Sequence, residues 1–155
     1  MLVTTACGAN AGSIYDDEGQ VYRKALSGDM TTLDASQATD TLTSQIMAQV
    51  YEGLYVLDEE DQAIPGIAKS MPKKSNGGKT LTIDLREDAI WSNGDPITAD
   101  DFVYSWRRVV APETASEYAF IMFDLKNAAE INQGQKKPEE LGVKALDKYL
   151  SLIHI

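Results

Sequence analysis

The fold of this chain is decided by AIWSNGDPITADDFVYSW, residues 89–106. A tight turn comes first, because Gly94 can adopt a positive φ and Pro96 restrains the residue before it to an extended conformation. Thr98 and Asp101 then form a variant of the capping box, in which Asp replaces the usual Glu. Their side chains can satisfy backbone N–H groups of the first helical turn, so the stretch predicts a turn followed by a capped helix.

The predicted helix, over residues 100–110, has one apolar face. Its apolar residues recur at helical spacing and are Phe102, Val103, Trp106, Val109 and Val110. This pattern is typical of a helix that packs on the core of a globular protein. Trp106, and Trp91 in the preceding turn, are therefore expected to pack rather than to bind a ligand.

The rest of the pattern predicts an α+β fold. Asp40 or Thr41 can cap a helix whose apolar face is formed by Leu42, Ile46, Val50 and Leu54. Apolar and polar residues alternate over 80–85, which predicts a half-buried strand. Further strands are expected over residues 21–26, 55–57 and 143–146, a helical segment over 118–132, and a single turn over 138–141.

Composition excludes several classes of function. The 155 residues include 24 acidic and 14 basic side chains, which gives a formal net charge of −10. This charge argues against binding to nucleic acid and against attraction to anionic lipid headgroups. With one Cys and one His, these residues alone cannot build a structural zinc site, a Cys–His nucleophile pair or a Ser-His-Asp triad. No metal site and no cofactor is expected, and no stretch is long enough to span a bilayer.

As a literal string, residues 89–106 resemble the signature of the extracytoplasmic oligopeptide-binding proteins, the family 5 solute-binding components of ABC importers. Other motifs resemble the same family in the same order along the chain. They are Leu33-Asp34, QVYEGL at 49–54, IPGIAKS at 64–70, LTIDLREDA at 81–89, PETASEYA at 112–119, and the stretch from Lys137-Pro138 to Ala145. Each match is weak by itself, whereas a collinear series over most of the chain is specific.

The resemblance implies an incomplete fold of the periplasmic-binding-protein type II kind. Residues 21–51 would form the N-terminal part of lobe I, and residues 52–149 most of the small α+β domain that is particular to the family. The implied function is capture of extracellular oligopeptides by closure of two lobes, without covalent chemistry, and their delivery to an ABC permease. The protein is expected to be a monomer.

The family holds its peptide as an extended strand, through backbone hydrogen bonds that ignore side-chain identity. The resemblance places Thr39, Asp40 and Thr41 in the segment that contacts the peptide, and Tyr118 at an aromatic position that lines the cleft. Two alternatives stay open, because Asp40 can serve as a helix cap and Tyr118 can pack in the core. The aspartate that pairs with the peptide amino group in the family would lie downstream of this sequence.

The N-terminus resembles the end of a bacterial lipoprotein signal, with residues 1–7 as a truncated remnant. Cys7 would carry the lipid and anchor the protein to the membrane outside the cytoplasm, in the periplasm or at the cell surface. Residues 8–20 are mostly small or acidic and have no periodic apolar face, so a flexible tether is expected. The alternative is an ordinary free Cys in a disordered terminus.

The last residues, 150–155, lack the alternating polar residues with which the family pattern would continue after Tyr149. We therefore expect a non-native tail here, produced by a frame shift or by foreign flanking sequence. His154 lies within this tail and is assigned no function.

Functions other than oligopeptide capture are also compatible with the sequence. A member of the same family can bind a dipeptide, a nickel complex, haem or an oligosaccharide, and a surface lipoprotein on the same scaffold can serve adhesion or signalling. A carboxylate pair would indicate a glycosidase, and the candidates are Asp84, Glu87 and Asp88, or Asp100 and Asp101. Helix capping explains the second pair, so neither an enzyme nor a catalytic residue is predicted.

Overall fold

The computed structural model describes residues 15–16, 21–22 and 25–155. Cys7, the signal remnant and most of the predicted tether lie outside the described residues. Strand β1 (Tyr15–Asp16) pairs antiparallel with β2 (Val21–Tyr22). The strand predicted over 21–26 is present as β2, in a separate two-stranded sheet, but it is shorter than predicted, because residues 25 and 26 lie in no strand.

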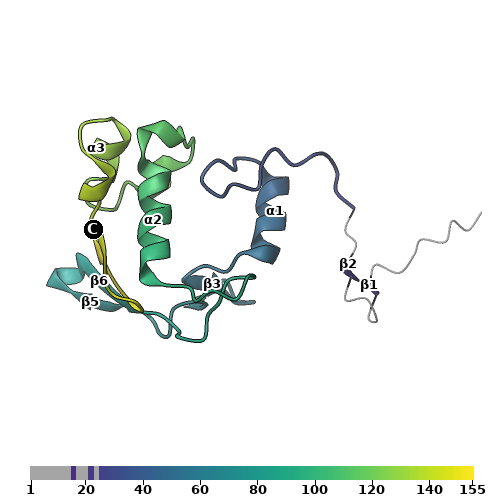
Figure 1. Ribbon diagram of the computed structural model, residues 1–155, viewed down its shortest axis with the longest axis horizontal. Coiled ribbons are helices and arrows are strands. Elements are labelled where there is room, and N and C mark those ends of the chain that lie inside the picture. The colour runs from purple at the N-terminus through teal and green to yellow at the C-terminus, as the bar shows by residue number, and fades with distance from the viewer. Residues whose placement is uncertain (1–14, 17–20, 23–24) are drawn as a thin grey trace, which may run out of the picture.

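The main sheet is antiparallel and has four strands in the order β5-β6-β8-β7 (Figure 1). They are β5 (Lys73–Ser75), β6 (Thr80–Asp84), β7 (Val143–Asp147) and β8 (Leu150–His154). The predicted half-buried strand over 80–85 is thus confirmed as β6, with Ile83 2% exposed. The β6 strand is preceded by a 3-10 turn, η1 (Asn76–Gly78), in which Gly77 and Gly78 have positive φ.

Strand β8 shows what the C-terminal residues do in the fold. It lies between β6 and β7 and pairs with both, with Ser151 opposite Ile83 and Ile153 opposite Leu81. Polar and apolar residues do not alternate along β8, but burial does. Ser151 and Ile153 are buried, while their neighbours in the strand are partly exposed. The segment therefore completes the sheet; its origin in foreign sequence stays a prediction.

Helix α2 (Ala99–Val110) begins as predicted. The Thr98 N–H and hydroxyl both donate to Asp101 Oδ2 at 2.7 Å, which confirms the capping box. The buried line of the helix is Ala99, Val103 and Val110, each at most 5% exposed. The Phe102 and Trp106 rings lie 5.9 Å apart, partly buried beside this line and against the core.

The turn before α2 is also present, with Gly94 at φ 91° and its N–H donating to the Trp91 carbonyl. Packing of Trp91 is a wrong expectation, since this side chain is 42% exposed. Trp91 lies in the loop itself, whereas Trp106 is carried by the helix that faces the core. Trp106 is therefore partly buried against the core, whereas Trp91 stays exposed.

The predicted helical segment over 118–132 is interrupted. It consists of a 3-10 turn, η3 (Ala119–Met122), and a short helix, α3 (Ala128–Asn132), separated by Asn127 at φ 70°. The cause is tertiary, because the Lys126 N–H donates to the His154 carbonyl and the Lys126 carbonyl accepts from the Gly142 N–H. These bonds attach the backbone to the end of β8 and prevent a continuous helix.

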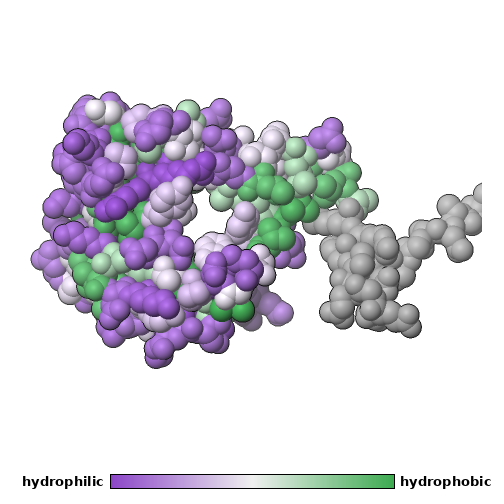
Figure 2. All heavy atoms as spheres, in the orientation of Figure 1, coloured by the Kyte–Doolittle hydropathy of each residue, from purple (hydrophilic) through white to green (hydrophobic). Residues whose placement is uncertain are grey.

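Helix α1 (Thr41–Val50) is followed by the hairpin of β3 (Tyr55–Leu57) and β4 (Ala63–Pro65). Figure 1 shows α1 standing apart from the main sheet, and Figure 2 shows apolar surface gathered over it. Of the apolar face predicted from its sequence, Leu42, Ile46 and Leu54 are partly buried, and Val50, the last residue of the helix, is 67% exposed. The only fully buried side chain of α1 is that of Thr43.

The segment before α1 is attached to the C-terminal end of α2 by one ion pair. The Arg108 guanidinium donates to both carboxylate oxygens of Asp34, at 2.6 and 2.5 Å. The hydrogen bond from Arg108 lowers the pKa of Asp34 to about 2, with help from the Ser36 N–H. The pair is partly exposed, at 36% for the Arg side chain and 29% for the Asp side chain.

Ser151 provides a test of the sheet. It is 1% exposed, and its hydroxyl has no hydrogen-bond partner within the described part of the chain. A buried unsatisfied polar group is costly, so Ser151→Ala should raise the free energy of unfolding by about 1 kcal/mol in urea denaturation. Ser92→Ala, at an exposed position, is the control and should change little. Destabilisation by Ser151→Ala alone would contradict this arrangement.

Asp34 provides a test of the ion pair. Its pKa is lower in the folded chain than the usual unfolded value near 4, so its stabilisation is complete above about pH 4 and is lost as the pH falls towards 2. Asp34→Asn should lower the free energy of unfolding by about 1 kcal/mol at pH 7, after allowance for solvent screening. The difference in free energy of unfolding between the variant and the wild type should disappear as the pH falls from about 4 to about 2. A gap that does not change with pH would exclude a charge-based role.

Candidate functional site

The first part of the predicted site lies on a loop, residues 31–40, that is closed on itself. The Thr31 hydroxyl donates to Asp40 Oδ2 at 2.6 Å, which joins the two ends of the loop. Inside it, the Asp34 carbonyl accepts from the Gln37 and Ala38 N–H groups, and the Asp34 carboxylate accepts from the Ser36 N–H. Hydrogen bonds within the loop therefore hold its shape, in addition to its contacts with other elements.

Asp40 is the N-cap of α1, as its sequence position allowed. Its Oδ1 accepts from the Thr43 N–H at 2.7 Å. The Thr31 hydroxyl and the Thr43 N–H lower the pKa of Asp40 to about 2, so the carboxylate is ionised at neutral pH. Both of its oxygens have partners within the chain, whereas Thr39 and Thr41 on either side are exposed. A peptide-contacting role for these three residues stays a prediction.

Tyr118, the second part of the predicted site, lies just before η3. Its side chain is 44% exposed, which speaks against a packing role in the core. Its ring lies 5.6 Å from that of Phe120, with an interplanar angle of 30°. Phe120 and Ile121 are 58% and 63% exposed, so Tyr118 belongs to an apolar, aromatic surface. Contact of Tyr118 with a peptide stays a prediction.

Sequence reasoning did not single out Phe120 and Ile121. A continuous helix over 118–132 would have placed part of this apolar run on a buried face. The break at Asn127 leaves the run in a 3-10 turn, and there Ala119 and not its neighbours is buried. The aromatic density of residues 118–123 is the one signal in the sequence that points to this surface.

The two parts of the predicted site belong to neighbouring segments. Asp34 is bonded to Arg108, and Gln37 Nε2 donates to the Thr114 carbonyl at 3.3 Å. Thr114 closes η2 (Pro112–Thr114), the turn that leads on towards Tyr118. Among the described hydrogen bonds, none joins Thr39, Asp40 or Thr41 to Tyr118 directly, so the contact between the segments runs through Asp34 and Gln37.

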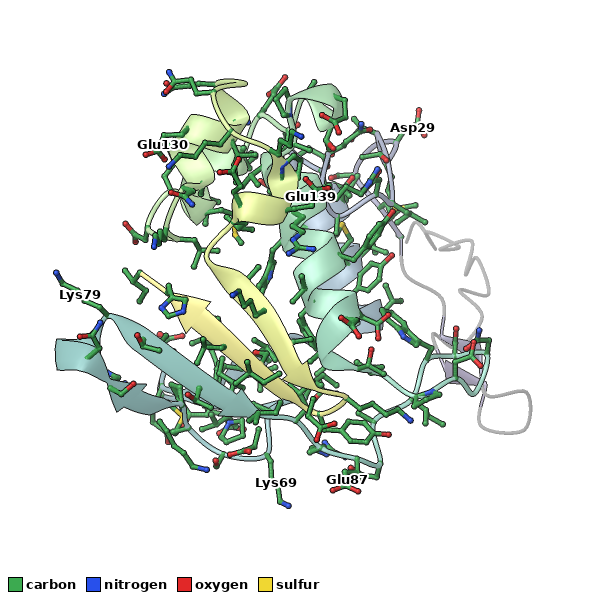
Figure 3. All side chains as sticks on the ribbon, turned by 60° about the vertical axis from the view of Figure 1, so that its left-hand side comes forward. Asp29, Lys69, Lys79, Glu87, Glu130 and Glu139 are labelled. Carbon is green, nitrogen blue, oxygen red and sulfur yellow. The ribbon has the colours of Figure 1, made fainter. Side chains whose placement is uncertain are left out.

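An open groove of about 550 Å³ lies along the outer side of α2, between η2 and the turn η4 (Pro138–Glu140). Its lining combines charged side chains of both signs, from Arg107, Arg108, Glu113 and Glu139, with apolar groups and the 70% exposed Tyr104. Arg107 donates to the Glu139 carbonyl at 3.3 Å, and Figure 3 shows Glu139 on its turn beside α2. Such a lining can bind polar groups by hydrogen bonds and charge.

Three of the five carboxylates that could indicate an enzyme have structural partners. Asp84 pairs with Lys73 at 2.8 Å, Asp88 pairs with Arg86 at 3.0 Å, and Asp101 closes the capping box. The pKa of Asp88 is lowered by its hydrogen bonds to Arg86, which keeps this carboxylate ionised. A glycosidase acid needs a raised pKa instead, so Asp88 is suited to its ion pair and not to acid catalysis.

The described residues hold neither a cluster of metal ligands nor a membrane-spanning helix. No group of three or more His, Cys, Asp or Glu side chains is placed to hold a metal ion there. None of the helices in the same residues combines the length and apolar character needed to cross a membrane. The charged side chains labelled at the periphery in Figure 3, such as Lys69, Lys79 and Glu87, point outwards.

Comparison with known proteins gives consistent relatives. Residues 62–150 match the family model of bacterial extracellular solute-binding proteins, family 5 Middle. The periplasmic oligopeptide-binding protein OppA of Haemophilus influenzae is 46% identical over 113 residues, which are 72% of this chain and 21% of that protein. The dipeptide-binding protein of Lactococcus lactis is 36% identical over 144 residues, 93% of this chain and 25% of that protein.

Solved structures agree with the sequence relatives. The substrate-binding domain of an oligopeptide ABC transporter from Bacillus anthracis superposes with a TM-score of 0.82 at 50% identity, over 84% of this chain and 25% of that chain. Listeria monocytogenes OppA bound to peptide gives a TM-score of 0.80 at 44% identity, over 81% of this chain and 25% of that chain.

The chain thus spans about a quarter of the length of the relatives it matches. The model match covers more than half of the chain, and the predicted resemblance and α+β periplasmic-binding-protein architecture, in incomplete form, are both confirmed. The chain belongs to family 5 of the bacterial extracellular solute-binding proteins, a family of binding proteins rather than of enzymes.

Proposed function

We propose that the chain is part of the substrate-binding component of an ABC importer, which captures extracellular oligopeptides for uptake. The observation that carries the proposal is its likeness, at 44% identity and a TM-score of 0.80, to a structure described as OppA bound to peptide. The component would act outside the cytoplasm, as a monomer without cofactor or catalytic residue, and would deliver its peptide to a permease in the membrane. A lipid on Cys7 would anchor it, with residues 8–20 as the tether.

In this proposal the chain supplies one side of a binding cleft. Residues 21–51 contribute to lobe I, and residues 52–149 form the α+β domain beside it. Thr39 is exposed within a loop that is already internally bonded, and Thr41 is exposed at the first position of α1, so both can contact an extended peptide at little cost in ordering. Tyr118 offers an aromatic face on the neighbouring segment.

Apolar side chains at the C-terminal end of α1 are exposed, and a further part of a longer polypeptide would cover them. Val50, Tyr51 and Leu33 are 67%, 51% and 52% exposed, and they lie on or beside one helix. Tyr51 donates its hydroxyl to the Leu33 carbonyl at 3.4 Å, which keeps these apolar groups together. Contiguous exposed apolar surface of this kind marks a place where another part of a protein packs.

A second candidate ligand is a dipeptide. The Lactococcus lactis relative is named a dipeptide-binding protein and matches 93% of this chain. Recognition through backbone atoms suits both ligands, and the length of the bound peptide would be set by parts of the relatives that this chain does not match.

The ligand can be identified directly. The polypeptide encoded by the complete reading frame should be purified without added peptide, and its bound material analysed by mass spectrometry. Peptides of mixed sequence are expected, whereas dipeptides alone would favour the second candidate. A single nickel complex or haem would contradict both.

The 155 residues alone should give no saturable heat with tetra-alanine in calorimetry, because one side of the cleft is absent. The complete polypeptide, titrated in parallel, is the positive control. Tight binding by the 155 residues would contradict a cleft formed between two lobes.

A further inference from the structure

Loop 31–40 is held together by hydrogen bonds between its own residues. The Thr31–Asp40 bond closes it, the Asp34 carboxylate fixes the Ser36 N–H, and the Asp34 carbonyl fixes the N–H groups of Gln37 and Ala38. Ser36 is 6% exposed. Where Asp34 is held, the residues that follow it up to the start of α1 are held as well.

The partner of Asp34 is equally well fixed. Arg108 lies in the last turn of α2, between the core and the turn η2. Val110, two residues later, is fully buried, and its carbonyl accepts from Asn132 Nδ2 at 3.4 Å. Ala115, in the left-handed conformation at φ 50°, then turns the chain towards Tyr118. Arg108 and Tyr118 therefore belong to one segment that is anchored to the core.

Few hydrogen bonds join loop 31–40 to the segment that runs from Arg108 to Tyr118. Among the described hydrogen bonds, those that link loop 31–40 to α2 and η2 are the two from Arg108 to Asp34 and the one from Gln37 to Thr114. The Arg108–Asp34 contact is a two-bond fork, which fixes direction as well as distance. A lysine would keep the charge but could not form this fork.

We propose that the Asp34–Arg108 pair is a positioning strut that sets where Thr39–Thr41 lie relative to Tyr118, and thereby sets the affinity for an extended peptide. The inference rests on the proposed function, since it assigns a role to residues that do not themselves contact the peptide. A peptide that pairs with one segment and contacts the other needs both at a fixed spacing, and misplacement of either weakens binding.

The test compares two Arg-to-Lys variants of the complete polypeptide. Arg108→Lys breaks the strut, and Arg86→Lys breaks another two-bond Arg–Asp pair, whose partner Asp88 is only two residues away. Tetra-alanine is the probe in calorimetry, because its side chains add little to backbone recognition. Arg108→Lys should bind it roughly tenfold more weakly than the wild type, while Arg86→Lys binds unchanged.

Thermal unfolding separates positioning from stability. The melting temperature of Arg108→Lys should match that of Arg86→Lys to within a few degrees. Unchanged peptide affinity in Arg108→Lys would overturn the proposal. A loss of affinity accompanied by a melting temperature well below that of Arg86→Lys would overturn it too, because lost stability would then explain the weaker binding. Asp34→Asn, which keeps an acceptor for the Ser36 N–H, should reproduce the loss of affinity.

Hydrogen exchange on the 155-residue chain needs no ligand. In Arg108→Lys, amides of residues 36–43 should exchange faster while those of β6 and β8 stay as in the wild type; Arg86→Lys should leave residues 36–43 unchanged. Equal exchange of the amides of residues 36–43 in all three proteins would overturn the proposed positioning role of the Asp34–Arg108 pair. If the complete wild-type polypeptide binds no peptide, the proposed function fails, and the exchange result still decides whether the pair positions the loop.

Discussion

The packing of α2 against the sheet is the interaction on which the rest of the structure depends. Ala99, Val103 and Val110 close the core over Ile83, Val143 and Ile153 of three neighbouring strands. Strand β6 and the β7–β8 pair are about 60 residues apart in the sequence, and packing against α2 joins them in one hydrophobic core. The capping box at Thr98 fixes where the helix begins, and so which residues form its buried line.

Both parts of the candidate site are attached to this unit through the end of α2. Arg108 holds the loop that leads to Thr39, and η2 leads on to Tyr118. The charged fork lies at the margin of the core, where partial exposure keeps the cost of desolvating two charges low. The fold thus presents two exposed surfaces beside the C-terminal end of α2.

Local signals in the sequence predicted the local structure well. The turn at Gly94, the box at Thr98 and Asp101, and the cap at Asp40 are confirmed, since each is satisfied by atoms within a few residues. The family resemblance is confirmed by the family model that matches residues 62–150. Errors arose where distant backbone intervened, as at Lys126, whose bonds to His154 and Gly142 interrupt the predicted helix.

The sequence by itself determined the α+β class, the position of α2 and the family, because periodicity and capping chemistry are written in neighbouring residues. Only the tertiary structure decided that residues 150–154 become an inner strand, that Trp91 is exposed, and that Asp34 lies against Arg108. The physical reason is that these outcomes depend on hydrogen bonds and burial between residues far apart in the chain, which no local pattern encodes.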